Sequence, residues 1–125
     1  HPYTQTARPG SRAPHVWLGE NRTILDLFGR AVTLLQFSGA ADVSGIEAAA
    51  QKRGVPLQTA DIDNAEAANL YERRLVLVRP DGHVAWRANA PPTDPAALVD
   101  RVRGATNVYR LDRAKQNPSS VFGES

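Results

Sequence analysis

The sequence has 125 residues, enough for one compact domain whose core needs no disulfide or metal. It contains no cysteine, which excludes disulfides, thiolate metal sites and thiol redox chemistry. A formal net charge of +2 does not by itself indicate nucleic-acid binding, and no apolar run approaches the ~20 residues that span a bilayer. We therefore expect a cytoplasmic protein with neither a membrane nor a nucleic-acid partner.

The N-terminal part of the chain is predicted to lead into the fold through an extended segment and two short elements. Residues 1–16 contain three prolines, a density that prevents a regular helix, so we expect an extended linker from a missing upstream domain. The absence of methionine and the opening His1 support an upstream start. Residues 16–18 are then predicted to form a short strand, and Thr23 to cap a short helix that Gly29 closes.

The middle of the chain alternates between strand and helix patterns. Residues 31–37 are apolar and predict a buried strand, followed by a loop at 38–41. Ser44 and Glu47 have the spacing of a capping box and predict the start of a helix that ends at Gly54. A second strand is predicted at 55–62. Asp63 and Glu66, again at capping-box spacing, predict a helix through Tyr71.

A hairpin and a helix follow. The apolar run 75–78, the turn sequence Arg79-Pro80-Asp81-Gly82 and residues 83–87 predict two antiparallel strands. Asp94 and Pro95 predict the start of a helix that ends at Gly104, with one apolar face. Residues 105–125 lose periodicity, and we expect a loosely ordered tail.

This element order predicts an α/β fold. Strand–helix alternation favours parallel pairing, and the closing hairpin adds antiparallel strands. We expect a thioredoxin-like mixed sheet with helices on both faces, over residues 17–104, without redox cysteines. Half of a Rossmann fold is the competing architecture, but no glycine-rich phosphate loop follows any predicted strand.

The residue types that could carry chemistry do not form a recognisable motif. His1, His15 and His83 are too far apart in the sequence to favour a metal site, and His83 is expected to face water. The carboxylates of 61–66 are assigned to helix capping, and no serine lies in a nucleophile elbow. Trp86 is expected to pack on the sheet, and the basic stretch 101–115 to be a solvated face. Contact of that stretch with an acidic surface of a parent enzyme remains an alternative.

Three ordered segments carry a family resemblance. They are residues 10–15 (GSRAPH), residues 25–35 with LDLFG and TLL, and residues 77–87 (LVRPDGHVAWR). Together they resemble the C-terminal domain of FAD-dependent aromatic-ring hydroxylases of the phenol hydroxylase and polyketide hydroxylase type. The resemblance covers residues 10–104, and the third segment is the most specific.

The resemblance implies a non-catalytic domain with a thioredoxin-like fold. Its parent enzyme would use FAD, NAD(P)H and O₂ to hydroxylate an aromatic ring, and the FAD and substrate domains would precede it in the same chain. The resemblance implies no catalytic, cofactor-binding or metal-binding residue at these positions, and no cofactor bound by the fragment alone. Contacts with those upstream domains, or with a second copy in a homodimer, are expected at Arg12, His15 and Trp17.

Two other functions remain open from the sequence. A free-standing, redox-inactive thioredoxin-like module would act by binding another protein and would have a complete polar surface. A nucleic-acid module would show binding that depends steeply on salt.

Overall fold

The chain folds as an α/β domain around a mixed four-stranded sheet. The computed structural model describes residues 5–37, 39 and 41–104. The sheet strands are β3 (Val32–Gln36), β4 (Leu57–Asp61), β5 (Leu75–Val78) and β6 (Val84–Ala88). A separate hairpin pairs β1 (Trp17–Gly19) with β2 (Arg22–Thr23). The helices are η1 (Ile24–Leu27), a 3₁₀ turn, then α1 (Ser44–Lys52), α2 (Ala65–Tyr71) and a helix at 95–104.

The strands lie in the order β4-β3-β5-β6. β3 and β4 are parallel and are joined by a crossover through α1, whereas β3 with β5 and β5 with β6 are antiparallel. Every residue of β3 and of β5 is buried because these two strands occupy the centre of the sheet. The prediction of a mixed sheet with a closing hairpin is confirmed.

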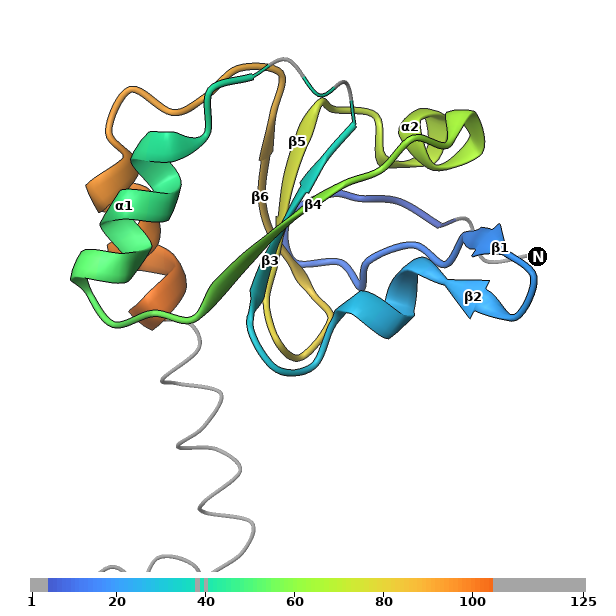
Figure 1. The fold of residues 1–125 in the computed structure, drawn as a ribbon, viewed down its shortest axis with the longest axis horizontal. Helices are drawn as coiled ribbons and strands as arrows, with labels where there is room; N and C mark the ends of the chain where they lie inside the picture. Colours follow the sequence, from blue (N-terminus) through green and yellow to red (C-terminus); the bar gives the residue numbers. More distant parts are fainter. Residues whose placement is uncertain (1–4, 38, 40, 105–125) are drawn as a thin grey trace, which may run out of the picture.

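Two hydrophobic cores lie on opposite faces of this sheet, because successive side chains of a strand point to opposite sides. Leu34, Leu75 and Leu77 pack with α1 and the helix at 95–104. Leu35 and Val76 pack with α2, η1 and the N-terminal segment. Figure 1 shows the two groups of elements on either side of the strands. The expectation of helices on both faces is therefore confirmed.

The structure corrects two helix caps. Val43 is the N-cap of α1 and makes no side-chain bond, while the Ser44 amide and hydroxyl both donate to the Asp42 carboxylate. Glu47 instead accepts a hydrogen bond from the Thr59 hydroxyl on β4. The predicted Ser44–Glu47 capping box is wrong because Ser44 is already helical and its polar partner precedes it.

The cap of α2 also differs from the prediction. Asn64 is the N-cap, and its side-chain oxygen accepts a hydrogen bond from the Ala67 amide at 2.9 Å. Asp63 and Glu66, which have capping-box spacing, are exposed and do not form that box. The prediction was therefore wrong by one residue, although the helix and its end at Tyr71 are as expected.

The hairpin of β5 and β6 has the turn that its sequence predicts. The Gly82 amide donates to the Arg79 carbonyl at 2.9 Å, and Gly82 has a φ of +85°. This backbone conformation favours glycine because it has no Cβ. The carboxylate of Asp94 accepts a bond from the Ala97 amide and so caps the last helix, also as predicted.

Residues 5–16 form no helix, and they pack closely on the sheet. The Gly10 amide donates to the Val84 carbonyl at 2.7 Å, the Val84 amide to Ser11 at 2.8 Å, and the Ala13 amide to Gly82 at 2.8 Å. The segment therefore covers the start of the edge strand β6. The domain boundaries stay predictions, and the predicted tail at 105–125 lies outside the described residues. Within those residues, no helix is long and apolar enough to cross a membrane.

Candidate interdomain surface

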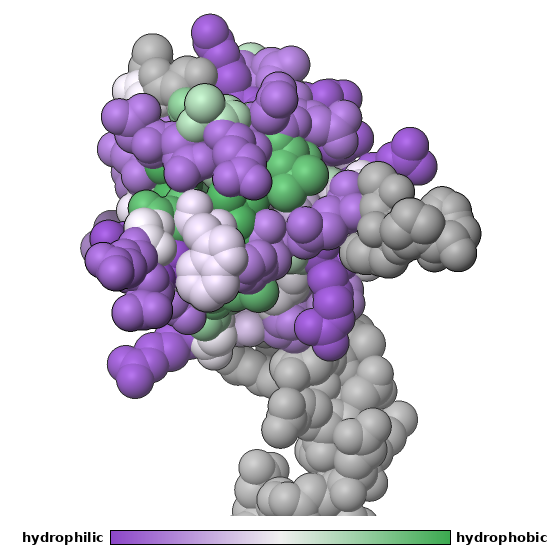
Figure 2. Space-filling view, turned by 90° about the vertical axis from the view of Figure 1, so that its right-hand side faces the viewer, coloured by the Kyte–Doolittle hydropathy of each residue, from purple (hydrophilic) through white to green (hydrophobic). Residues whose placement is uncertain are grey.

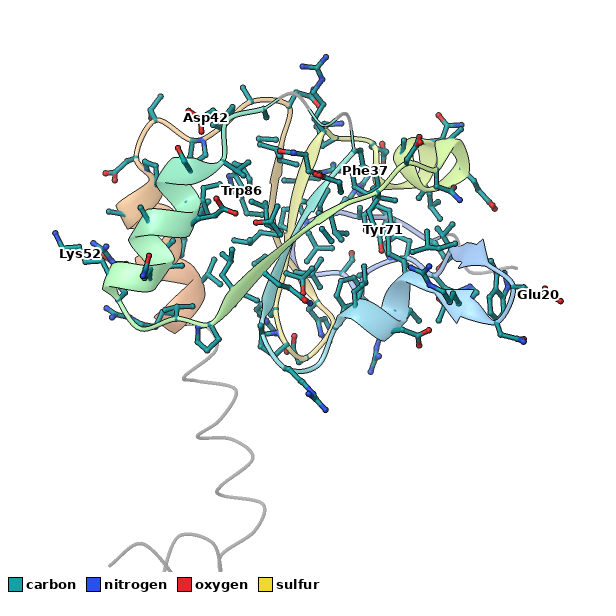
Figure 3. All side chains as sticks on the ribbon, in the orientation of Figure 1. Glu20, Phe37, Asp42, Lys52, Tyr71 and Trp86 are labelled. Carbon is teal, nitrogen blue, oxygen red and sulfur yellow. The ribbon has the colours of Figure 1, made fainter. Side chains whose placement is uncertain are left out.

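The segment that leads into β1 is held in place by side-chain bonds. The His15 amide donates to the Gln5 side-chain oxygen at 2.6 Å. The hydroxyl of Tyr71 on α2 donates to the Pro14 carbonyl at 2.6 Å, and burial raises the pKa of this phenol. Figure 3 shows Tyr71 between α2 and this N-terminal segment. These two bonds fix the peptide that joins Pro14 to His15, so the backbone position of His15 is defined.

His15 connects two exposed features of the surface. Its ring makes an edge-to-face contact with Trp17, with 4.9 Å between ring centroids and an interplanar angle of 89°. It also lines an open groove of about 440 Å³, together with Gln5, Arg12, Leu25, Phe28 and Pro80. The structure therefore brings Arg12, His15 and Trp17, the three candidate contact residues, into one continuous region.

Trp17 and Leu25 are the exposed large hydrophobic side chains of the described residues, at 59% and 40% exposure. Trp17 lies on β1 opposite Thr23 of β2. Thr23 caps η1 by accepting from the Leu25 amide, and Asp26 accepts from the Thr23 amide in return. This confirmed cap turns Ile24 into the core and leaves Leu25 outside. Figure 2 views the side with β1, β2 and α2, where hydrophobic surface lies among hydrophilic atoms.

The groove is bordered by a charged turn. The Asp81 carboxylate, only 7% exposed, accepts two hydrogen bonds from the Arg79 guanidinium and one from the His83 amide. Burial acts to raise the pKa of Asp81, but these bonds and the positive charge of Arg79 outweigh it and hold the pKa below its ordinary value. The ion pair keeps Pro80 and Gly82 in position at the groove.

Leu25 and Phe28 are the groove residues that the sequence reasoning missed as surface positions. Both lie in the short helix that the sequence predicts between Thr23 and Gly29, where an exposed leucine has the same sequence signal as a buried one. The sequence signal for their exposure was the short distance between Thr23 and Gly29, because so short a helix cannot bury all of its apolar side chains on one face.

Of the remaining candidate residues, only His83 adjoins this surface, through a β-bridge between its backbone and that of Arg12. Trp86 packs partly buried against the core shared with α1, as expected (Figure 3). His83 is half-buried, with its Nδ1 3.4 Å from the Asp81 carboxylate, so it does not simply face water. Arg101 and Arg103 are exposed on the last helix, whereas His1 and the basic residues beyond 104 lie outside the described part. No cluster of three potential metal ligands occurs among the described residues.

The described residues do not fit a flavin. Dinucleotide-binding α/β folds hold the phosphates at a glycine-rich turn before a helix, where they approach the backbone. Gly45 at the start of α1 is the nearest match, but a Cβ there would lie 3.1 Å from the Pro95 side chain. This glycine therefore serves the packing of α1 against the last helix, and no step of flavin chemistry can be assigned to these residues.

Comparison with known proteins identifies the family. The model of the aromatic-ring hydroxylase C-terminal domain matches residues 6–106. The chain belongs to this family. The resemblance inferred from the three sequence segments is thereby confirmed, and it extends over nearly all of the described residues.

Relatives of this aromatic-ring hydroxylase domain are much longer proteins. The chain is 40% identical over 119 residues to a 4-methyl-5-nitrocatechol 5-monooxygenase of a Burkholderia species, covering 82% of this chain and 22% of that protein. It is 40% identical over 93 residues to the FAD-dependent monooxygenase opdD of Penicillium oxalicum, covering 70% and 18%. The chain thus spans about a fifth of the length of these relatives.

A solved structure of the same family has a matching fold. The rebeccamycin biosynthetic enzyme RebC with reduced flavin is 49% identical, with a TM-score of 0.80, and the match covers 83% of this chain and 20% of RebC. In these full-length relatives the domain is attached to a larger FAD-dependent enzyme chain.

Proposed function

We propose that this chain is the non-catalytic C-terminal domain of an FAD-dependent, NAD(P)H-using aromatic monooxygenase, and that it supports assembly of that enzyme. The observation that carries the proposal is the family match over residues 6–106, within relatives that are monooxygenases about five times longer. FAD would supply the oxygen chemistry in the rest of the polypeptide, which would also bind the aromatic ring.

We also infer that the fold is thioredoxin-like without thioredoxin chemistry. The strand order β4-β3-β5-β6, with only β3 and β4 parallel, supports this assignment. The loop after β3, where a thioredoxin has its redox cysteines, reads Ser-Gly-Ala-Ala in this sequence. A domain without a thiolate cannot exchange disulfides, so its contribution must come from its surface and its rigidity.

The proposal is tested with the complete natural polypeptide that contains this sequence. We expect that polypeptide to purify with bound FAD and to oxidise NAD(P)H when an aromatic substrate is added. The 125-residue chain alone should show neither the flavin absorbance nor the oxidation. A natural polypeptide without flavin would refute the proposal.

A second candidate is a free-standing, redox-inactive module that binds another protein. The exposed Trp17 favours it, since tryptophan is enriched at the centres of protein interfaces. This candidate predicts that the natural polypeptide is no longer than this domain and carries no flavin. The same purification therefore separates the two functions.

A further inference from the structure

We propose that Arg12, His15, Trp17, Leu25 and Phe28, together called the Trp17 surface, form the site where the domain docks on the flavin-containing part of its own polypeptide. This inference rests on the proposed function and specifies the surface and the partner. Both exposed large hydrophobic side chains of the described residues belong to this surface. An exposed apolar patch with polar surroundings is typical of an interaction site.

The Trp17 surface is preorganised for binding. His15 is held through its backbone by Gln5, and its ring contacts Trp17 edge-to-face. Leu25 lies in a 3₁₀ turn that the Thr23–Asp26 capping box fixes. Because these groups are already ordered in the free domain, little conformational entropy is lost when a partner covers them.

The N-terminal segment lies at the groove, which favours the upstream part of the same polypeptide as the partner that covers the Trp17 surface. Gln5, the first residue that the structure describes, lines the same groove as Arg12 and His15. In full-length relatives the domain makes up only about a fifth of the chain. Upstream domains would therefore enter the fold beside the Trp17 surface, and covalent attachment raises the effective concentration of such a partner.

Charge argues against a second copy as the occupant. Within residues 8–30 the exposed charged side chains are four arginines, at positions 8, 12, 22 and 30, and two carboxylates, Glu20 and Asp26. The Asp81 carboxylate at the groove is paired with Arg79. Asp26 is engaged in the capping box. A two-fold homodimer through this surface would bring two copies of this net-positive region together, which is electrostatically unfavourable. We therefore expect an apolar partner surface with acidic residues at its margin.

The test uses the full polypeptide with a protease site inserted immediately before His1. After cleavage, the wild-type domain should co-elute with the flavin-containing part in size-exclusion chromatography. Trp17→Ser and Arg12→Glu should each weaken this association at least about tenfold, because a buried tryptophan or arginine anchor contributes strongly to an interface. Both side chains are exposed in the free domain, so neither substitution removes a core contact.

Lys52→Glu is the matched charge control. Lys52 lies at the end of α1, on the side of the sheet opposite Glu20 and the β1–β2 hairpin (Figure 3). It should leave the association unchanged. The surface assignment would be overturned if the wild-type pieces separated, if Lys52→Glu acted like Arg12→Glu, or if the cleaved domain eluted as a Trp17-dependent dimer. In each of these cases bound flavin would remain, whereas failure of the proposed function would show as the absence of flavin.

Discussion

At the scale of single residues, two buried polar groups tie the N-terminal segment and the β5–β6 turn to the rest of the domain. Tyr71 bonds to the Pro14 carbonyl from α2, and Asp81 bonds to Arg79 and to the His83 amide. Buried polar groups stabilise a fold only while their partners are in place, because an unpaired group keeps its desolvation penalty. These residues should therefore be sensitive to small chemical changes.

Tyr71→Phe should lower the free energy of unfolding at pH 7 by about 1 kcal/mol, because it leaves the Pro14 carbonyl without its donor. The raised pKa of Tyr71 means that its contribution is complete below the ordinary value of 10.0 and is lost as the pH rises above it. Urea unfolding at pH 7 and pH 10.5 should thus show a smaller difference between wild type and variant at the higher pH. An equal difference at both values would contradict this assignment.

Asp81→Asn should lower the free energy of unfolding at pH 7 by about 2 kcal/mol, since it weakens hydrogen bonds between charged groups. A carboxyl whose pKa is lowered by folding stabilises the fold above its ordinary value of 3.8, and that contribution disappears on acidification. Urea midpoints of wild type and variant should therefore converge between pH 7 and pH 3. Asp63→Asn, at an exposed site, is the control and should change little at either pH.

At the scale of elements, short capped segments determine which side chains reach the surface. The four-residue η1 buries Ile24 and leaves Leu25 exposed, and its capping box holds that arrangement. The start of α2 is set by Asn64. The position of a helix cap depends on the backbone conformation of one residue, and a neighbouring residue of similar chemistry can take that position instead.

The cap of α2 can be tested by two neighbouring substitutions. Asn64→Ala should destabilise the domain by about 1 kcal/mol, because it removes the acceptor of the Ala67 amide. Asp63→Ala should change the stability by less than about 0.5 kcal/mol, as expected for an exposed residue without such a role. Chemical unfolding of both variants checks the assignment, and a larger effect at Asp63 would restore the capping box predicted from the sequence.

At the scale of the whole molecule, the sheet separates two cores with different neighbours. One core is closed by α1 and the helix at 95–104, and the other by α2, η1 and the N-terminal segment. The Trp17 surface lies on the same side of the sheet as the second core, against which Phe28 packs. Damage to the first core should therefore affect folding without altering the proposed docking surface.

Leu98→Ala should lower the free energy of unfolding by about 3 kcal/mol, because Leu98 is 2% exposed and its truncation leaves a cavity between the last helix and the sheet. In the full polypeptide, the folded variant should still bind to the flavin-containing part like wild type. Thermal unfolding and the cleavage assay measure the two effects separately. Arg101→Ala, at an exposed position on the same helix, is the control for loss of a side chain.

The sequence by itself determined the order of the main elements, the β5–β6 hairpin and the family. These depend on local signals: the apolar runs at 32–36 and 75–78, the Pro-Asp-Gly turn, and a motif of eleven residues. It also singled out Arg12, His15 and Trp17 as candidate contact residues. These signals can be recognised in the sequence because each of them involves residues close together in the chain.

Only the tertiary structure decided which residues form the surface around Trp17. His15, Leu25 and Pro80 meet at one groove although they lie far apart in the sequence. Their meeting depends on the N-terminal segment pairing with β6 and on the Tyr71–Pro14 bond, which join positions more than fifty residues apart. Apolar side chains such as Leu25 have the same local pattern whether buried or exposed, so packing alone determines which of them another protein can reach.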